Sequence, residues 1–160
     1  MGPLIDERSV DKAARLVADA VDRGATLVLG GERVDRPGTY YAPTVLDTVQ
    51  PGSAILSTEI FGPVVAITRF DTEDEAVRLA NDTEYGLVSY VFTKDLARGQ
   101  RMAERLESGM VGLNTGVVSN AAAPFGGVKA SGLGREGAHD GLEEYLETVY
   151  VLTPDPFAAP

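Results

Sequence analysis

The chain has 160 residues, a net charge of −10, one histidine and no cysteine. This composition excludes a disulfide scaffold and makes a metal site unexpected, and its acidity disfavours nucleic acid and anionic membrane surfaces as partners. No apolar run approaches the length of a membrane span and no secretory signal is visible, so we expect a cytoplasmic globular protein.

The first part of the chain predicts a helix, a strand and a loop. Apolar residues recur at helical spacing over residues 7–23, and Gly24 follows as a helix stop. The stretch TLVLGG, residues 26–31, indicates a short strand that enters a turn. Residues 32–40 are polar and contain a Pro-Gly pair, which predicts a hairpin or a surface loop.

Extended and helical segments then alternate. Residues 40–49 are extended, and Pro43 indicates either a sheet edge or an irregularity there. Thr72, at capping-box spacing from Glu75, and Asp95 begin the two helices of this region. Short connections in the order β-α-β-α-β predict a parallel sheet with right-handed crossovers. The five segments are residues 64–70, 72–82, 87–93, 95–108 and 110–114.

A glycine-rich segment, residues 115–141, follows and is too long for a simple connector, which predicts a functional loop. Gly132, Gly134 and Gly137 match the dinucleotide-binding pattern G-x-G-x-x-G. That pattern needs a strand before it and a βαβ unit around it, whereas residues 126–131 do not resemble a strand. We interpret the match as a coincidence, and an autonomous nucleotide-binding domain is the weakest of three hypotheses.

An acid and an aromatic ring lie just before the strand expected at residues 64–70. Glu59 and Phe61 precede Gly62-Pro63, and positions two apart on an extended segment project to the same side. Proline restricts the residue before it and can fix such a turn. The pattern alone favours a surface glutamate beside a core phenylalanine.

Four stretches follow one another along the chain: TEIFGPVVAITRF, ANDTEYGLVSYVFTKDLARG, GMVGLNTG and APFGGVKASGLGREG. In this order they resemble the C-terminal part of NAD(P)-dependent aldehyde dehydrogenases. The resemblance covers almost the whole chain, and GLNTGVVSNAAAPFGG is most similar to succinate-semialdehyde dehydrogenases. It implies an α/β fold: the βαβαβ parallel sheet of a partial catalytic domain over residues 1–143, a C-terminal oligomerisation strand over 144–153 and a tail over 154–160.

In that family a cysteine thiolate attacks the aldehyde, hydride passes to the nicotinamide, and a glutamate activates the water that hydrolyses the thioester. Both protein groups lie upstream of the matched region, and this chain has no cysteine. The resemblance therefore implies part of an oxidoreductase that converts an aldehyde, here succinate semialdehyde, to its acid with NAD or NADP. We expect no catalytic residue in this chain and no activity of the chain alone.

The resemblance also assigns roles to single residues. Glu59 is implied to accept hydrogen bonds from the nicotinamide ribose and Phe61 to contact the nicotinamide ring. Leu87 matches a position near the nicotinamide, and a plain strand-core role is equally expected. Ser119 matches a serine that holds the distal carboxylate of the substrate, or it caps its loop. Phe125 matches an aromatic wall of the substrate tunnel, or it packs under a glycine turn.

Two further residues are structural candidates. Arg135 and Glu147 match a charged pair that supports the loop and a subunit contact. We expect the chain to form a homo-oligomer or to associate with a complementing upstream segment. The alternative function is a non-catalytic oligomerisation or interaction module. In it, residues 144–153 would form an unpaired edge strand, and the exposed apolar faces would favour self-association or marginal stability.

Overall fold

The computed structural model describes residues 1–154 and 157 of the chain. The chain divides into two compact units, Met1–Glu73 and Asp74–Pro160, and the division falls in the sequence at the start of a helix. The single partial domain expected over residues 1–143 stays a prediction. Apart from residues 154 and 157, the tail expected at 154–160 lies outside the described residues.

The first unit combines one long helix with a three-stranded sheet. The strand order is β1-β2-β3, with β1 antiparallel and β3 parallel to β2. Because β2 is the central strand and Pro43 immediately precedes it, the sheet-edge interpretation of Pro43 is wrong. The elements are α1 (Glu7–Asp22), β1 (Thr26–Leu29), β2 (Thr44–Asp47), the 3-10 turn η1 (Ala54–Leu56) and β3 (Val64–Ala66).

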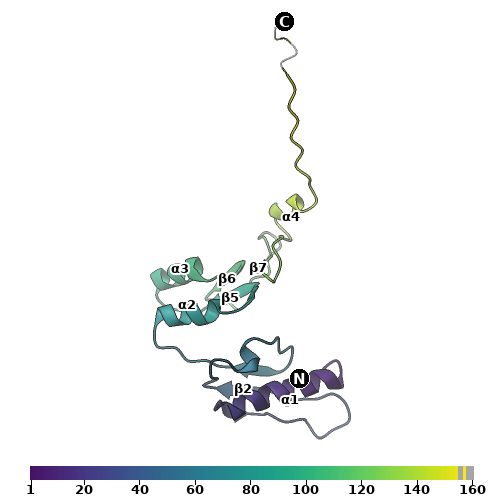
Figure 1. Cartoon of the computed structure of the whole chain (residues 1–160), viewed down its shortest axis with the longest axis vertical. Coiled ribbons are helices and arrows are strands. Elements are labelled where there is room, and N and C mark those ends of the chain that lie inside the picture. Colours follow the sequence, from purple (N-terminus) through teal and green to yellow (C-terminus); the bar gives the residue numbers. More distant parts are fainter. Residues whose placement is uncertain (155–156, 158–160) are drawn as a thin grey trace. The chain divides into compact units, whose positions relative to one another are not determined.

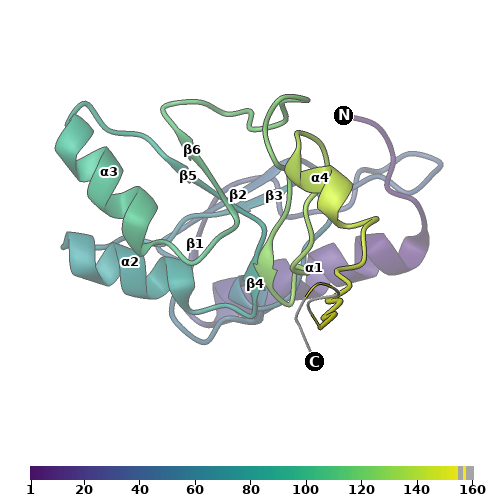
Figure 2. The ribbon, with the colours of Figure 1, turned by 90° about the horizontal axis from the view of Figure 1, so that it is seen from above.

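Helix α1 forms where the sequence predicts it and buries its apolar stripe. The Asp6 carboxylate accepts a hydrogen bond from the backbone N–H of Ser9 at 2.8 Å and so caps the N-terminus. The helix ends before Gly24, whose φ of 99° is a conformation that favours glycine. Figures 1 and 2 show α1 along one face of the sheet. Its buried residues are Val10, Ala13, Leu16, Val17 and Ala20, which share one core with Leu46 of β2 and Val64 of β3.

The second unit contains the predicted βαβ connection. Strands β5 and β6 are parallel and are joined through α3, which Asp95 caps by accepting from the backbone N–H of Arg98 at 3.1 Å. Helices α2 and α3 lie side by side in both views, and Arg105 pairs with Asp74 between them at 2.6 Å (Figures 1 and 2). The elements are α2 (Glu73–Asn81), β4 (Tyr85–Gly86), β5 (Val88–Val91), α3 (Leu96–Arg105), β6 (Met110–Leu113), β7 (Val128–Lys129) and α4 (Asp140–Glu143).

The α/β class is confirmed, but the single three-stranded parallel sheet is wrong. Strand β3 pairs with β2, β5 pairs with β6, and no ladder joins β3 to β5 in the part of the chain that the structure describes. Strand β7 lies within residues 126–131, which the sequence analysis excluded from strands, and it pairs antiparallel with β4. Two-residue strands carry no periodicity, and tertiary packing decides which strands pair, so neither feature is visible in the pattern.

Residues 144–153, the expected oligomerisation strand, form no strand within the described chain. A strand requires a partner ladder, and here the segment has none. Its apolar side chains are exposed, Tyr145 to 88%. Whether it pairs with another subunit stays a prediction. No helix among the described residues is both long and apolar enough to span a membrane.

One polar group in the core of the first unit is unsatisfied. Tyr41 is only 5% exposed, and its hydroxyl has no hydrogen-bond partner among the described residues. Burial also raises the pKa of this phenol above its ordinary value. A buried hydroxyl without a hydrogen-bond partner lowers the free energy of unfolding, whereas burial of the aromatic ring does not.

We therefore expect Tyr41→Phe to leave the urea midpoint of the chain unchanged or to raise the free energy of unfolding by up to about 1 kcal/mol. Tyr40→Phe is the matched control, because Tyr40 is partly exposed and its hydroxyl accepts from Arg36. A loss of stability in Tyr41→Phe would contradict the assignment and reveal a partner for the hydroxyl.

Candidate functional site

The first unit carries the acid and the ring in a loop between η1 and β3. Ile60 packs against the core of α1 and the sheet, whereas Glu59 and Phe61 on either side of it are exposed, Phe61 to 80%. Glu59 makes no hydrogen bond or ion pair with any described residue. Both side chains that the sequence singles out are therefore free to contact a ligand.

Phe61 differs from both sequence-based expectations of its geometry. It is not a core residue, and its φ of 44° places it in the left-handed region, so the backbone is not regularly extended through it. A non-glycine residue there costs about 1–2 kcal/mol. Such strain persists only where neighbouring contacts hold the backbone.

Those contacts lie directly after Phe61. The Pro63 carbonyl accepts a hydrogen bond from the Thr44 N–H at 2.8 Å, which continues the pairing of β2 with β3 by one residue. The Gly62 carbonyl accepts from the Val64 N–H at 2.9 Å. Gly62 also lies over α1, because a Cβ atom placed on it would be 3.7 Å from the Cβ of Ala13. The exposed ring is thus presented from a fixed turn.

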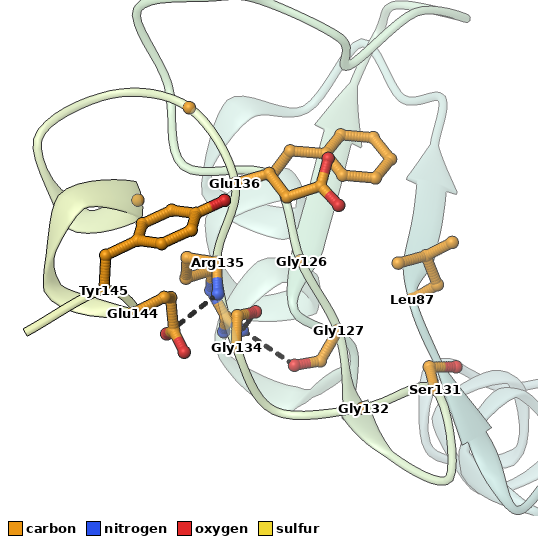
Figure 3. A pocket seen from close by; sticks show the side chains of 13 residues that line it. Leu87, Gly126, Gly127, Ser131, Gly132, Gly134, Arg135, Glu136, Glu144 and Tyr145 are labelled. Atoms are coloured by element: carbon orange, nitrogen blue, oxygen red, sulfur yellow. Dashed lines mark hydrogen bonds between the residues drawn. The ribbon is translucent and has the colours of Figure 1, made fainter.

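The second unit contains a hollow of about 600 Å³ (Figure 3). Leu87, between β4 and β5, and Phe125 line the same hollow, so the structure brings these two candidates together. Ser119 does not line it and is exposed on its loop. The hollow is also lined by Glu136 and Tyr145, which the sequence analysis did not single out.

Glycines let the backbone segments around this hollow touch. A Cβ atom on Gly126 would lie 2.2 Å from the Gly134 carbonyl oxygen, and one on Gly109 would lie 2.1 Å from the Gly126 carbonyl oxygen. Phe125 and Glu136 exchange backbone hydrogen bonds of 2.8 and 2.7 Å across the same contact. The glycine doublet after Phe125 therefore places that ring by close backbone packing.

The glycines of the G-x-G-x-x-G pattern have conformational roles. Gly132 and Gly137 have φ values of 96° and 72°, and the helix that follows, α4, has only four residues. Although β7 precedes the pattern, it is two residues long and antiparallel to β4. The strand–turn–helix arrangement that binds a dinucleotide is absent from this part of the described chain.

Arg135 supports the loop, but not through the expected charged pair. Its Nη1 donates to the Gly127 carbonyl at 2.8 Å, and its backbone N–H donates to Glu144 at 3.1 Å (Figure 3). The same Nη1 donates to the carbonyls of Leu133 and Gly134 at 2.7 and 2.9 Å. No ion pair joins Arg135 to Glu147 among the described residues, and Glu147 is exposed. A role of these two residues in a subunit contact stays a prediction.

Lys129 links three elements beside the hollow, and sequence reasoning missed this role. Its ammonium group donates to the carbonyls of Asn81 and Thr83 at 3.0 and 3.3 Å and pairs with Glu107 at 2.6 Å. The Asn81 side chain in turn bonds the Arg105 carbonyl and the Glu107 N–H, both at 2.9 Å. A cation at the C-terminal end of α2 is also favoured by the helix dipole.

Comparison with known proteins gives the family. The sequence matches the aldehyde dehydrogenase family over residues 1–151. It is 54% identical over 157 residues to a succinate-semialdehyde dehydrogenase of Paenarthrobacter nicotinovorans, covering 98% of this chain and 35% of that protein. It is 51% identical over 150 residues to a glutarate-semialdehyde dehydrogenase of Pseudomonas aeruginosa, covering 94% of this chain and 31% of that protein.

A solved structure also matches the chain, and it belongs to the same family. The crystal structure of a Mycobacterium tuberculosis aldehyde dehydrogenase complexed with NAD+ matches with a TM-score of 0.88 at 37% identity, covering 99% of this chain and 33% of that one. The α/β fold of the chain is therefore the fold of the matching part of solved aldehyde dehydrogenases. The chain belongs to the aldehyde dehydrogenase family, whose enzymes use NAD or NADP. The chain spans about a third of the length of the curated relatives that it matches.

The glycine contact at the hollow can be tested directly. We expect Gly126→Ala to lower the free energy of unfolding by about 1–3 kcal/mol, because its Cβ would overlap the Gly134 carbonyl oxygen. The measurement is urea denaturation followed by circular dichroism. Gly116→Ala is the matched control, since nothing lies within 4 Å of a Cβ atom there. Equal stability of the two variants would show that the backbone contact is absent.

Proposed function

We propose that the chain is the C-terminal segment of an NAD(P)-dependent aldehyde dehydrogenase and supplies one wall of its cofactor and substrate site. One observation carries this proposal. In a member of this family, Glu59 is exposed without a partner, and Phe61 is exposed on a strained backbone that neighbouring hydrogen bonds hold. Strained, exposed residues of this kind are concentrated at functional sites.

The chemistry of these side chains suits a nicotinamide cofactor. A free carboxylate such as that of Glu59 can accept from two vicinal ribose hydroxyls, and the face of Phe61 complements a planar heterocycle. Leu87, in the second unit, is proposed separately as a nicotinamide contact on the strength of the family resemblance, and its side chain lines the hollow. The bound cofactor would supply hydride acceptance, and these residues would orient it.

The proposed substrate is the semialdehyde of a short dicarboxylic acid, with succinate semialdehyde first. The relatives named above support this class, and Ser119 is an exposed hydroxyl that could donate to a distal carboxylate. Phe125 would form an aromatic wall. Succinate and glutarate semialdehydes differ by one methylene, which a pocket distinguishes by only about 10–200-fold.

A nucleophile must come from elsewhere, because this chain contains no cysteine. We therefore propose that the thiolate and the general base are provided by an upstream segment. The test is a chimera in which this chain replaces the matching third of the Paenarthrobacter nicotinovorans relative.

We expect the chimera to oxidise succinate semialdehyde with NAD+ or NADP+, and the isolated 160-residue chain to show no turnover above a heat-killed control. In the chimera, Glu59→Gln should raise the cofactor KM about tenfold and leave the aldehyde KM unchanged, since a hydrogen bond to a charged group is lost. The measurement is initial-rate NAD(P)H absorbance with each substrate varied.

Glu104→Gln in the same chimera is the matched control, because Glu104 is an exposed glutamate on α3 without a partner among the described residues. An unchanged cofactor KM in Glu59→Gln would refute the assignment of Glu59. Turnover by the isolated chain would refute the need for an upstream segment.

A second candidate function, an oligomerisation module, is favoured by one observation. Residues 144–153 expose a run of apolar side chains: Tyr145, Leu146, Val149, Tyr150, Val151 and Leu152. An exposed apolar segment without a ladder is a template for pairing with another chain. This candidate is compatible with the first, because a segment of an enzyme can also assemble it.

Sedimentation velocity tests the second candidate. We expect the unaltered chain to self-associate, and a variant with Val149→Lys and Val151→Lys to sediment as a monomer, because charge on an edge opposes strand pairing. Val117→Lys is the control, an exposed valine on the loop after β6. A sharp monomer peak for the unaltered chain, with cooperative melting at high temperature, would count against this role.

A further inference from the structure

Helix α1 makes a polar contact with η1, the turn that leads into the loop of Glu59 and Phe61. We propose that Asp19 is a positioning residue that fixes the upstream end of this loop and thereby sets the geometry of the cofactor contact. The inference rests on the cofactor role proposed above for Glu59 and Phe61. The contacts that carry it all lie within the first unit.

The Asp19 carboxylate bridges two partners. One oxygen accepts from the backbone N–H of Ala54 at 2.7 Å, across 35 residues of sequence, and the other accepts from Nε of Arg23 at 2.9 Å. The hydrogen bond from Arg23, followed by that from Ala54, lowers the pKa of Asp19 below its ordinary value. At neutral pH the group is therefore a charged acceptor in this position.

The contact with Ala54 replaces a cap that the local sequence does not supply. Ala54 begins η1, and the preceding Ser53 makes no capping hydrogen bond to the turn because its hydroxyl donates to the Gln50 carbonyl at 2.8 Å. The first N–H groups of a helical turn need an acceptor, and an anionic one is preferred. Asp19 provides it from a different helix.

The capped turn leads directly into the candidate cofactor loop. The Ala54 carbonyl accepts from the N–H groups of Ser57 and Thr58 at 3.2 and 3.0 Å, and Glu59 is the next residue. Ala54 is thus the fixed point upstream, as Pro63 is downstream through its bond from Thr44. Loss of the Asp19 contact would release only the upstream end, while β3 stays paired.

A purely local role for Asp19 makes different predictions. Asp19 and Arg23 form an i,i+4 pair on α1, with 27% and 51% of their side-chain surfaces exposed. Such exposed pairs contribute little to stability. Arg23→Gln removes this pair and keeps the carboxylate on Ala54, whereas Asp19→Ala removes both, so the two variants separate the roles.

The first experiment measures hydrogen–deuterium exchange in the 160-residue chain. Asp19→Ala should speed amide exchange over residues 54–62 about tenfold, the equivalent of one hydrogen bond to a charged group, and leave residues 85–91 unchanged. Asp22→Ala is the matched control, an exposed aspartate of the same helix without a partner among the described residues. Unchanged exchange at 54–62 overturns the inference.

The second experiment measures kinetics in the chimera described above. Asp19→Ala should raise the cofactor KM about tenfold with the aldehyde KM unchanged, while Arg23→Gln changes neither. Asp19→Asn should restore most of the affinity, because its amide oxygen can still accept from Ala54 and the side chain keeps its size. If Asp19→Ala does not fold, the kinetics of Asp19→Asn are the test of the inference. A change in both the aldehyde KM and the cofactor KM of Asp19→Asn would indicate a general structural role and overturn the inference.

The two proposals fail in distinguishable ways. If Glu59→Gln raises the cofactor KM and Asp19→Ala does not, the positioning role is overturned and the cofactor site stands. If Asp19→Ala speeds exchange at residues 54–62 but neither variant changes the cofactor KM, the positioning of the loop is supported and the cofactor role of Glu59 is overturned.

Discussion

The hydrogen bond from the Thr44 N–H to the Pro63 carbonyl is the constraint on which the first unit's candidate site depends. It extends the β2–β3 ladder to the residue before β3, so the turn at Gly62-Pro63 cannot move away from the sheet. Ile60 then packs inward on the core, and the side chains on either side of it are left exposed. The left-handed backbone of Phe61 is therefore a consequence of the turn at Gly62-Pro63 that leads into β3.

The second unit reaches a comparable result with a different contact. There, backbone touches backbone, because Gly109, Gly126 and Gly134 leave no side chain between the segments. The hydrogen bonds of Phe125 with Glu136 and the carbonyl contacts of Arg135 hold this packing in place. In both units, contacts of the main chain thus position the exposed or hollow-lining rings of Phe61 and Phe125, and the rings themselves take no part in these contacts.

This division explains what the sequence could and could not predict. Helix α1, its stop at Gly24 and the Asp95 cap follow from local periodicity and capping chemistry, and they were predicted. Strand pairing and the two-residue strands depend on partners distant in sequence, and residues 144–153 form no strand among the described residues. The pattern around Phe61 favours a core residue, and only the family resemblance indicates a site. The contacts of Lys129 with the Asn81 carbonyl and of Asp19 with the Ala54 N–H have no local sequence signal, because these two partners are main-chain groups of other elements.

The Lys129 ammonium group has a mechanical consequence for the second unit. It holds the last carbonyl of α2, the carbonyl of Thr83 and the carboxylate of Glu107 at one point, while its own backbone belongs to the strand that pairs beside Leu87. A displacement of the C-terminal end of α2 or of α3 would therefore displace β7 and, next to it, Leu87. One charged side chain thus ties the C-terminal ends of α2 and α3 to β7.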